Sequence, residues 1–421
     1  MTTLQDKLNS YGDGYWDFQK EKRAGVHEIA TYPAMMVAPM QHKIIGDIIK
    51  LEKNIDNIFD PFHGSGTTLV EGKKFNLNLI GIDINPLANI ITTVKINGVN
   101  TDTIYNSIED LIYNFRKLKN DITACHYFPK ISKWFREDVI SDLTVIRQAI
   151  ILEKNRKNRL YFWVCLSDLI RKYSNTRSST FKLHIKEEEK IISMENNVFN
   201  DFIILIKEKH LHLDSNYEKK QSITQGDSNI EMEKMKSNSV DLICTSPPYG
   251  DNGTTVTYGQ YSILSLLWMD RQDISVNNEE LISNFSAIDS QSLGGRLKNS
   301  KVREEIPALE EILTKISNQK KKKVNSFFSD YFLSLSHMIR ILKPNSLMVL
   351  TLGNRRVDNV EIRLDKITSD YCELKGLKVE ATFNRAIPRK RMPRKISNIK
   401  SHGAVSSMNN ETVLILRKGE N

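Results

Sequence analysis

The 421-residue sequence predicts an α/β protein with a doubly wound sheet and a large helical insertion. Three observations favour this class. Short apolar runs alternate with amphipathic segments within residues 1–100 and again after residue 221, as they do in a sheet covered by helices. The segment between them, 101–220, has helical spacing and dense charges. Near the C-terminus, apolar runs at 378–387 and 411–419 suit an antiparallel hairpin.

The first half of the sheet is predicted from a helix, a turn and two strands. Met and Ile side chains recur at helical spacing across residues 32–51. Residues 57–60 then form a short apolar run that leads into a glycine-rich turn and a helix, and the run 77–83 ends in an acid. Buried parallel strands have continuous apolar runs of this kind, so the pattern predicts a βαβ unit.

The second half of the sheet shows the same alternation of strands and helices. Strands are expected at 222–228 and 239–249, and another at 345–354 follows an amphipathic helix at 326–342. A polar stretch, 270–325, separates the two parts. Counting the two C-terminal runs, the sequence predicts six or seven strands in all.

Composition excludes several classes of protein. Sixty Lys and Arg face 51 Asp and Glu, and the net charge of +9 is a weak indication of a polyanionic partner. The four cysteines are far apart and the nine histidines lack metal-ligand spacing, so we expect neither disulfides nor a metal. There is no apolar run of about eighteen residues and no signal peptide, so we expect no membrane span and a cytoplasmic location.

A glycine-rich turn follows the first predicted strand. In Asp60-Pro-Phe-His-Gly-Ser-Gly66, the two glycines let the backbone approach a ligand, and the next helix offers unpaired N–H donors. The turn lacks the third glycine of a dinucleotide fingerprint. It also lacks the lysine of a phosphate-binding loop, because Thr67 and Thr68 follow directly. A nicotinamide cofactor and ATP are therefore disfavoured.

An acid ends the second predicted strand. Asp83 stands seventeen positions after Gly66, where a carboxylate can accept two hydrogen bonds from a ribose diol. The alternative is purely structural, because a tight turn can use glycine, and a strand can end in Asp, without a ligand. The combination of turn and acid favours a ribose-containing cofactor.

A second turn, Ser246-Pro-Pro-Tyr249, ends the strand segment predicted at 239–249. Two prolines keep this corner extended at the carboxyl end of the sheet, where open α/β proteins bind ligands. Its oxygens suit the N–H bonds of an exocyclic amino group on a flat base, and its aromatic ring can stack on that base. The base would have to leave the helical stack to reach it. The alternative is a plain loop in which Tyr249 fills a hydrophobic gap.

These residues resemble the amino-group DNA methyltransferases that use S-adenosylmethionine. The family's cofactor motif, Phe-x-Gly-x-Gly, is matched by Phe62, Gly64 and Gly66, and its catalytic motif, (Asp/Asn/Ser)-Pro-Pro-(Tyr/Phe), is matched by the second turn. The resemblance covers about 30–100 and 222–421. It implies a Rossmann-like methyltransferase sheet, with S-adenosylmethionine as cofactor.

The serine at the start of the catalytic motif is typical of cytosine-N4 methylation in that family, whereas Asp or Asn is typical of adenine-N6 methylation. Adenine remains the alternative. Cytosine-C5 chemistry needs a nucleophilic cysteine, and we expect Cys244 to pack in the core instead. Two further alternatives are an RNA base methyltransferase and a non-catalytic DNA-binding subunit on the same fold.

The resemblance also implies functional residues. Asp83 would hold the ribose, Asp227 would lie near the adenine, and a helix around Tyr32 would complete the methionine pocket. The catalytic residues would be Ser246, Pro247, Pro248 and Tyr249. The cofactor-binding residues would be Tyr32, Pro33, Asp60, Phe62, Gly64, Gly66, Thr67, Thr68, Asp83, Ile84, Asn85, Asp227 and Ser228.

The predicted organisation has three parts. Residues 1–100 form the first half of the catalytic domain with the cofactor motif, and 221–421 form the second half with the catalytic motif. Residues 101–220 are the helical insertion and a candidate DNA-recognition region. A second candidate for DNA contact is 270–325. The expected partner is double-stranded DNA, with a cognate restriction endonuclease as a functional companion implied by the resemblance.

Basic clusters outside the two motifs are candidate DNA contacts. Arg and Lys can track phosphates, and Arg can read base edges. The lysine run at 320–323 is expected in a solvated loop, with phosphate contact as the alternative. The candidate DNA-binding residues are Arg171, Lys172, Arg177, Arg389, Lys390, Arg391, Arg394 and Lys395.

Overall fold

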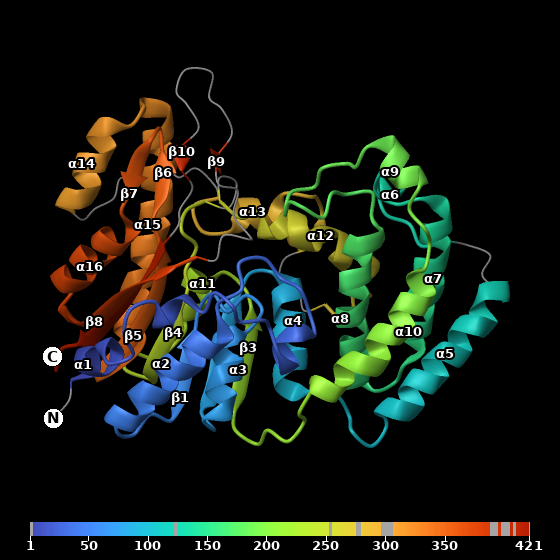
Figure 1. Cartoon of the computed structure of the whole chain (residues 1–421), viewed down its shortest axis with the longest axis horizontal. Coiled ribbons are helices and arrows are strands. Elements are labelled where there is room, and N and C mark those ends of the chain that lie inside the picture. Colours follow the sequence, from blue (N-terminus) through green and yellow to red (C-terminus); the bar gives the residue numbers. More distant parts are fainter. Residues whose placement is uncertain are drawn as a thin grey trace.

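A computed structural model describes residues 3–121, 125–251, 255–274, 279–295, 306–387, 395–396, 405–406 and 410–420. Within these residues, seven strands form one mixed sheet (Figure 1). In spatial order they are β3 (Gln221–Gln225), β2 (Asn78–Asp83), β1 (Asn57–Asp60), β4 (Val240–Thr245), β5 (Leu342–Gly353), β11 (Asn410–Lys418) and β8 (Leu377–Ala386). The predicted doubly wound α/β class is confirmed.

The topology brings the two predicted turns together. Strands β1 to β5 run parallel. The sheet builds outward from β1 through β2 to β3, and the chain then returns to β4 on the other side of β1. Open α/β sheets bind ligands where the strand order reverses in this way, at the carboxyl ends of the strands. The glycine turn follows β1 and the Ser-Pro-Pro-Tyr turn follows β4, so both border this crevice.

The expected C-terminal hairpin is confirmed. Strand β11 pairs antiparallel with β8, and it also pairs antiparallel with β5, so it lies between them. Since β11 runs against its neighbours, its N-terminal end lies at the edge of the sheet where the parallel strands finish. Residue Glu411 stands there, opposite Gly353 of β5 and Arg385 of β8.

Alternate residues of the strands face two different layers of helices. Leu242 and Cys244 of β4 pack in the core beneath α1 (Leu4–Asn9), α2 (Ala38–Leu51) and α3 (Thr67–Lys74). Ile243 packs in the opposite core, beneath α11 (Ser228–Glu233), α14 (Pro307–Lys315), α15 (Asn318–Ile341) and α16 (Leu364–Leu374). Cys244 is buried, as expected for a core residue.

The helical insertion lies beyond the β3 edge of the sheet (Figure 1). It contains α5 (Ile104–Asp121), α6 (Ile131–Trp134), α7 (Glu137–Leu152), α8 (Arg156–Tyr173), α9 (Glu188–Ile192) and α10 (Val198–Glu208). Large buried side chains such as Trp163 join it into one hydrophobic core with α4 (Pro86–Asn97) and α12 (Tyr258–Trp268). Among the described helices, none combines the length and apolar character needed to cross a membrane.

Two predicted elements differ from the structure. The helix expected across 32–51 begins only at Ala38, because Ala34 has a left-handed φ of 47° and Pro39 occupies the first turn. The lysine run 320–323 is not a loop: it forms the first turns of α15, since lysine favours helices and the apolar helical pattern extends to Val324.

Short elements complete the described chain. They are η1 (Tyr15–Asp17), η2 (Gly25–Glu28), η3 (Lys209–His212), η4 (Glu279–Ile282), α13 (Ala287–Gln291), β6 (Arg355–Val357), β7 (Val360–Ile362), β9 (Lys395–Ile396) and β10 (Val405–Ser406).

Candidate active site

A cleft of about 2610 Å³ runs along the carboxyl ends of the strands and is lined by residues of both turns. The predicted cofactor and catalytic residues line this cleft except for Asp60, Gly66 and Thr68, which lie beneath its surface. The cleft therefore brings together, in space, residues that are as far apart in sequence as Tyr32 and Tyr249.

The glycine turn needs its glycines. Gly66 has a φ of +78° and precedes α3, and a Cβ added to it would stand 2.7 Å from the Thr92 side chain. Gly64 also has a positive φ, of +52°. The imidazole of His63 braces the turn, with Nδ1 3.0 Å from the Gly64 carbonyl oxygen and Nε2 3.2 Å from the Asn89 amide oxygen. At Gly66 a side chain would not fit without moving Thr92, whereas at Gly64 an added Cβ would stand 3.6 Å from the Tyr32 ring, so only the positive φ disfavours a side chain there.

Asp83 joins the ends of β1 and β2. One carboxylate oxygen accepts a 2.9 Å hydrogen bond from the Gly64 N–H, and the other accepts a 2.8 Å bond from the Asn85 N–H. A carboxylate oxygen has a second lone pair, so these bonds leave acceptor capacity on the cleft side. The carboxylate can therefore hold the turn and accept from a ligand hydroxyl together.

Asp60 lies beneath both turns and contacts neither solvent nor the cleft. One oxygen accepts from the Phe62 N–H at 3.0 Å and from the Thr245 hydroxyl at 2.6 Å. Thr245 directly precedes Ser246, so this carboxylate joins the glycine turn to the Ser-Pro-Pro-Tyr turn, named the catalytic turn below after the role that the resemblance implies for it. Burial raises the pKa of Asp60 to about 6. The structure thus gives this predicted cofactor residue a supporting position.

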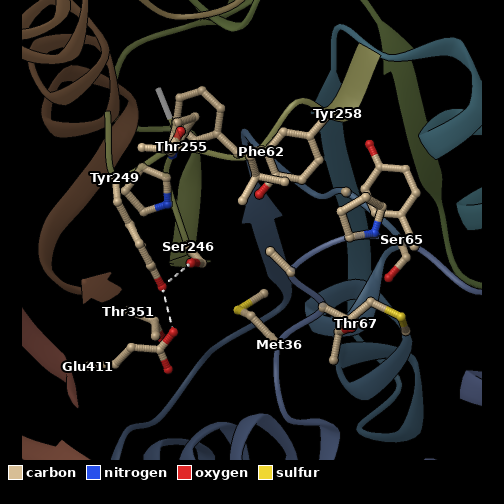
Figure 2. A pocket seen from close by; sticks show the side chains of 18 of the residues that line it. Met36, Phe62, Ser65, Thr67, Ser246, Tyr249, Thr255, Tyr258, Thr351 and Glu411 are labelled. Atoms are coloured by element: carbon tan, nitrogen blue, oxygen red, sulfur yellow. Dashed lines mark hydrogen bonds between the residues drawn. The ribbon is translucent and has the colours of Figure 1, made fainter. Parts of the chain in front are cut away.

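Two tyrosines form one wall of the cleft. The Tyr32 ring stacks on the Tyr258 ring, with centroids 5.9 Å apart and planes 26° apart. The Tyr32 hydroxyl accepts a 2.9 Å bond from the Asn85 amide. Tyr258, which Figure 2 shows among the residues that line the pocket, begins α12 shortly after the catalytic turn. The sequence analysis does not include Tyr258 among the site residues. The apolar helical run that starts at Tyr258 would have predicted a helix beside the Ser-Pro-Pro-Tyr turn.

The catalytic turn has an internal hydrogen-bond chain. The hydroxyl of Ser246 lies 3.1 Å from the hydroxyl of Tyr249, which in turn donates to a Glu411 carboxylate oxygen at 3.0 Å (Figure 2). Burial, and then the nearby carboxylate, raise the pKa of Tyr249 well above its ordinary value. The phenol is therefore a protonated donor at physiological pH.

The side chain of Arg355 packs against Gly250, directly after the catalytic turn. A Cβ added to Gly250 would stand 2.2 Å from Nη1 of Arg355, whose guanidinium pairs with Asp251 at 3.2 Å. Burial lowers the pKa of Arg355. The sequence carried no signal for Arg355 or for Glu411, because both reach the turn through strands that are distant in the chain.

The three predicted DNA-binding residues of the insertion, Arg171, Lys172 and Arg177, each have a partner within the chain. None of the three is among the described residues that line the cleft. The Arg171 guanidinium lies 4.4 Å above the Tyr261 ring. The remaining two form surface ion pairs, Lys172 with Asp201 and Arg177 with Glu187. Arg389, Lys390, Arg391 and Arg394 lie outside the described residues, and Lys395 begins β9.

Two turns that share one crevice suit an enzyme with two substrates, because donor and acceptor must meet for a group to be transferred. Comparisons with known proteins agree with this class. Residues 5–93 match the model of a family described as DNA methylase. The chain is 31% identical to Type II methyltransferase M.MvaI of Kocuria varians over 443 residues, which cover 98% of this chain and 96% of that protein. The chain belongs to the amino-group DNA methyltransferases.

More distant similarities are of the same kind. Type II methyltransferase M.BsoBI of Geobacillus stearothermophilus is 24% identical over 59% of this chain and 52% of that protein. The solved structure of the rRNA methyltransferase aviRa from Streptomyces viridochromogenes aligns with a TM-score of 0.32 and 8% identity, covering 95% of this chain and 92% of that one.

S-adenosylmethionine is the cofactor of this enzyme, and the residues of the cleft fit it. Cleft-lining residues follow three adjacent strands: Gly64 after β1, Asp83 at the end of β2, and Asp227 after β3. A turn with two glycines lets the backbone approach a ligand, and the Asp83 carboxylate has spare acceptor capacity for a ribose diol, so the lining fits a cofactor that contains a ribose. When bound, this cofactor supplies the methyl group from its sulfonium.

Proposed function

We propose that this enzyme methylates the N4 amino group of cytosine at a specific site in double-stranded DNA. The observation that carries the proposal is the hydroxyl of Ser246, held beside Tyr249 at the crevice that the cofactor residues also line. In the family that the chain resembles, serine at this position is typical of cytosine-N4 methylation. The role of the catalytic turn and the identity of the base are both parts of this proposal.

The chain's own groups would position the acceptor amine. Ser246 and the backbone carbonyls of the Pro-Pro corner offer acceptors for the amino N–H bonds, which orients the nitrogen lone pair toward the methyl donor. The Tyr249 ring offers a face for the extruded base. No residue needs to form a covalent intermediate. The amine becomes strongly acidic once it is methylated, so a strong base is not required for its proton to leave.

The cofactor roles follow from position. Phe62, Gly64 and Asp83 would contact S-adenosylmethionine, with the ribose at the carboxylate, while Asp60 would act from beneath the turns. Asp227 would lie near the adenine, although one of its oxygens also caps α11 by accepting from the Asn229 N–H.

The insertions are the proposed DNA-contacting regions. Lys172 and Arg177 form exposed ion pairs, which are weak and can exchange for phosphate contacts. Arg171 packs on a tyrosine ring and is better placed to support the insertion than to bind DNA. Lys320 and Lys323 of α15 line the cleft and join the proposed contacts. A partner restriction endonuclease would act on the same DNA site.

The test is methylation of mixed-sequence duplex DNA with labelled S-adenosylmethionine, followed by analysis of the nucleosides. We expect the label in N4-methylcytosine. Label in N6-methyladenine alone would overturn the assignment of the base. Transfer RNA competes as an acceptor in a parallel reaction, and preferential labelling of it would overturn the assignment of the substrate.

A further inference from the structure

Glu411 reaches the catalytic turn only through the sheet topology. It is 162 positions from Tyr249 in the chain, at the N-terminal end of the antiparallel strand β11. That end lies at the edge where the parallel strands finish, so the carboxylate arrives beside a turn that follows β4. No feature near Ser246 in the sequence points to it.

The carboxylate of Glu411 is fixed from two sides. One oxygen accepts the hydrogen bond from the Tyr249 hydroxyl, and the other pairs with Arg385, its cross-strand neighbour on β8. The two side chains are 15% and 5% exposed, and Arg385 also donates to the Trp16 carbonyl at 3.2 Å. Each carboxylate oxygen therefore faces a donor, the phenol on one side and the guanidinium on the other, and a carboxylate paired in this way acts only as an acceptor.

This arrangement determines the direction of the whole hydrogen-bond chain. A phenol has one hydroxyl proton, and Tyr249 uses it in the hydrogen bond that it donates to the Glu411 carboxylate. The 3.1 Å contact between the two hydroxyls must then be a bond from Ser246 to Tyr249. Since the serine proton is used in that bond, the remaining lone pairs of its oxygen are the ones that an incoming group meets.

We propose that Glu411 is a positioning residue that makes Ser246 a hydrogen-bond acceptor and so selects an amino group on the target base. An amino group donates N–H bonds and fits such an acceptor, whereas the carbonyl at the matching position of thymine or uracil does not. The inference rests on the proposed catalytic role of the turn. It holds for either amino base, because cytosine and adenine both present an N–H donor.

The experiment compares four full-length variants under single-turnover conditions on mixed-sequence duplex DNA. Tyr249→Phe keeps the ring and removes the link, and Glu411→Gln replaces the carboxylate by an amide that can donate or accept. The double variant combines the two changes. Glu380→Gln is the matched control: Glu380 pairs with Arg417 across the same two strands, away from the turn. Unfolding temperature and S-adenosylmethionine affinity are measured for all.

We expect Tyr249→Phe and Glu411→Gln each to slow methyl transfer about tenfold, the worth of one hydrogen bond to a charged group. The affinity for S-adenosylmethionine should stay within about twofold, because the link lies on the acceptor side. The double variant should be no slower than the slower single variant, since both changes break one chain. Glu380→Gln should keep the wild-type rate.

Three outcomes would overturn the inference: a wild-type rate in Glu411→Gln, a wild-type rate in Tyr249→Phe, or effects that multiply to about a hundredfold in the double variant. If Glu411→Gln fails to fold, the rate of Tyr249→Phe still shows whether the link between Tyr249 and Glu411 affects methyl transfer. A wild-type rate in Ser246→Ala would instead remove the proposed role of the turn itself. The two failures are therefore distinguishable.

Discussion

The glycine turn and the Ser-Pro-Pro-Tyr turn follow neighbouring strands and border one crevice, yet they are held in different ways. The glycine turn depends on its own backbone and on groups from the same βαβ unit, such as His63 and Asp83. The catalytic turn depends on side chains from distant strands, Glu411 and Arg355. The difference implies that a change in the first turn should damage folding and cofactor binding, whereas a change around the second should damage transfer.

The largest effect is expected for Gly66→Ala. The positive φ and the contact with Thr92 should together lower the free energy of unfolding by about 2–4 kcal/mol and abolish S-adenosylmethionine binding. Denaturant unfolding and calorimetry measure the two effects. Gly376→Ala is the control, because it has a φ of +87° with nothing within 4 Å of the added Cβ. Equal costs at the two glycines would contradict the account.

Asp60 is the shared support of both turns, and its removal should change the pH dependence of stability. Its pKa of about 6 lies above the usual 3.8, so the folded protein holds a proton that the unfolded chain has released. Stability from this group is therefore present below about pH 4 and is lost as pH rises to about 6, by about 3 kcal/mol. In Asp60→Asn that loss should disappear. Unfolding curves at several pH values test this, and parallel pH profiles for the two proteins would refute it.

Gly250→Ala should affect the catalytic turn with a smaller structural cost. Its Cβ would meet the far end of the Arg355 side chain, which can move, although moving it strains the pair with Asp251. We expect methyl transfer to slow about tenfold, with stability changed by about 1 kcal/mol and cofactor affinity unchanged. Loss of S-adenosylmethionine binding in this variant would mean that the two turns are not separable.

The smallest effect is expected in the helical insertion, away from both turns. Lys172→Ala and Arg177→Ala should each weaken DNA binding a few-fold and reduce its salt dependence by about one charge. Arg171→Ala should instead lower stability, because its guanidinium packs on Tyr261. Binding titrations at several salt concentrations distinguish these outcomes, and an unchanged salt dependence would remove the two residues from the DNA interface.

The sequence predicted the local parts of this molecule well. The sheet, the helical insertion and the C-terminal hairpin follow from apolar periodicity, and the two turns follow from glycine and proline spacing. The start of α2 was misplaced, because Ala34 adopts a backbone conformation that composition does not reveal. The sequence predicts a loop at the lysine run 320–323, whereas the structure has a helix there, because the helical character of the run depends on the apolar residues after it.

The long-range parts could not be predicted. Glu411 reaches the catalytic turn only because β11 is inserted between β5 and β8. Arg355 reaches it because it follows β5, which pairs with β4, and no local pattern encodes either pairing. The ion pairs of Lys172 with Asp201, 29 positions away, and of Arg177 with Glu187, ten positions away, do not follow from residue spacing either.

The central claim is that the glycine turn binds the donor while the catalytic turn positions the acceptor. Ser246→Ala tests it most directly, with the affinity for S-adenosylmethionine and the single-turnover rate on DNA measured on the same preparation. We predict an unchanged affinity and a rate about 100-fold lower, as is found when one oriented polar group is removed from an active site. Full turnover in this variant would contradict the account.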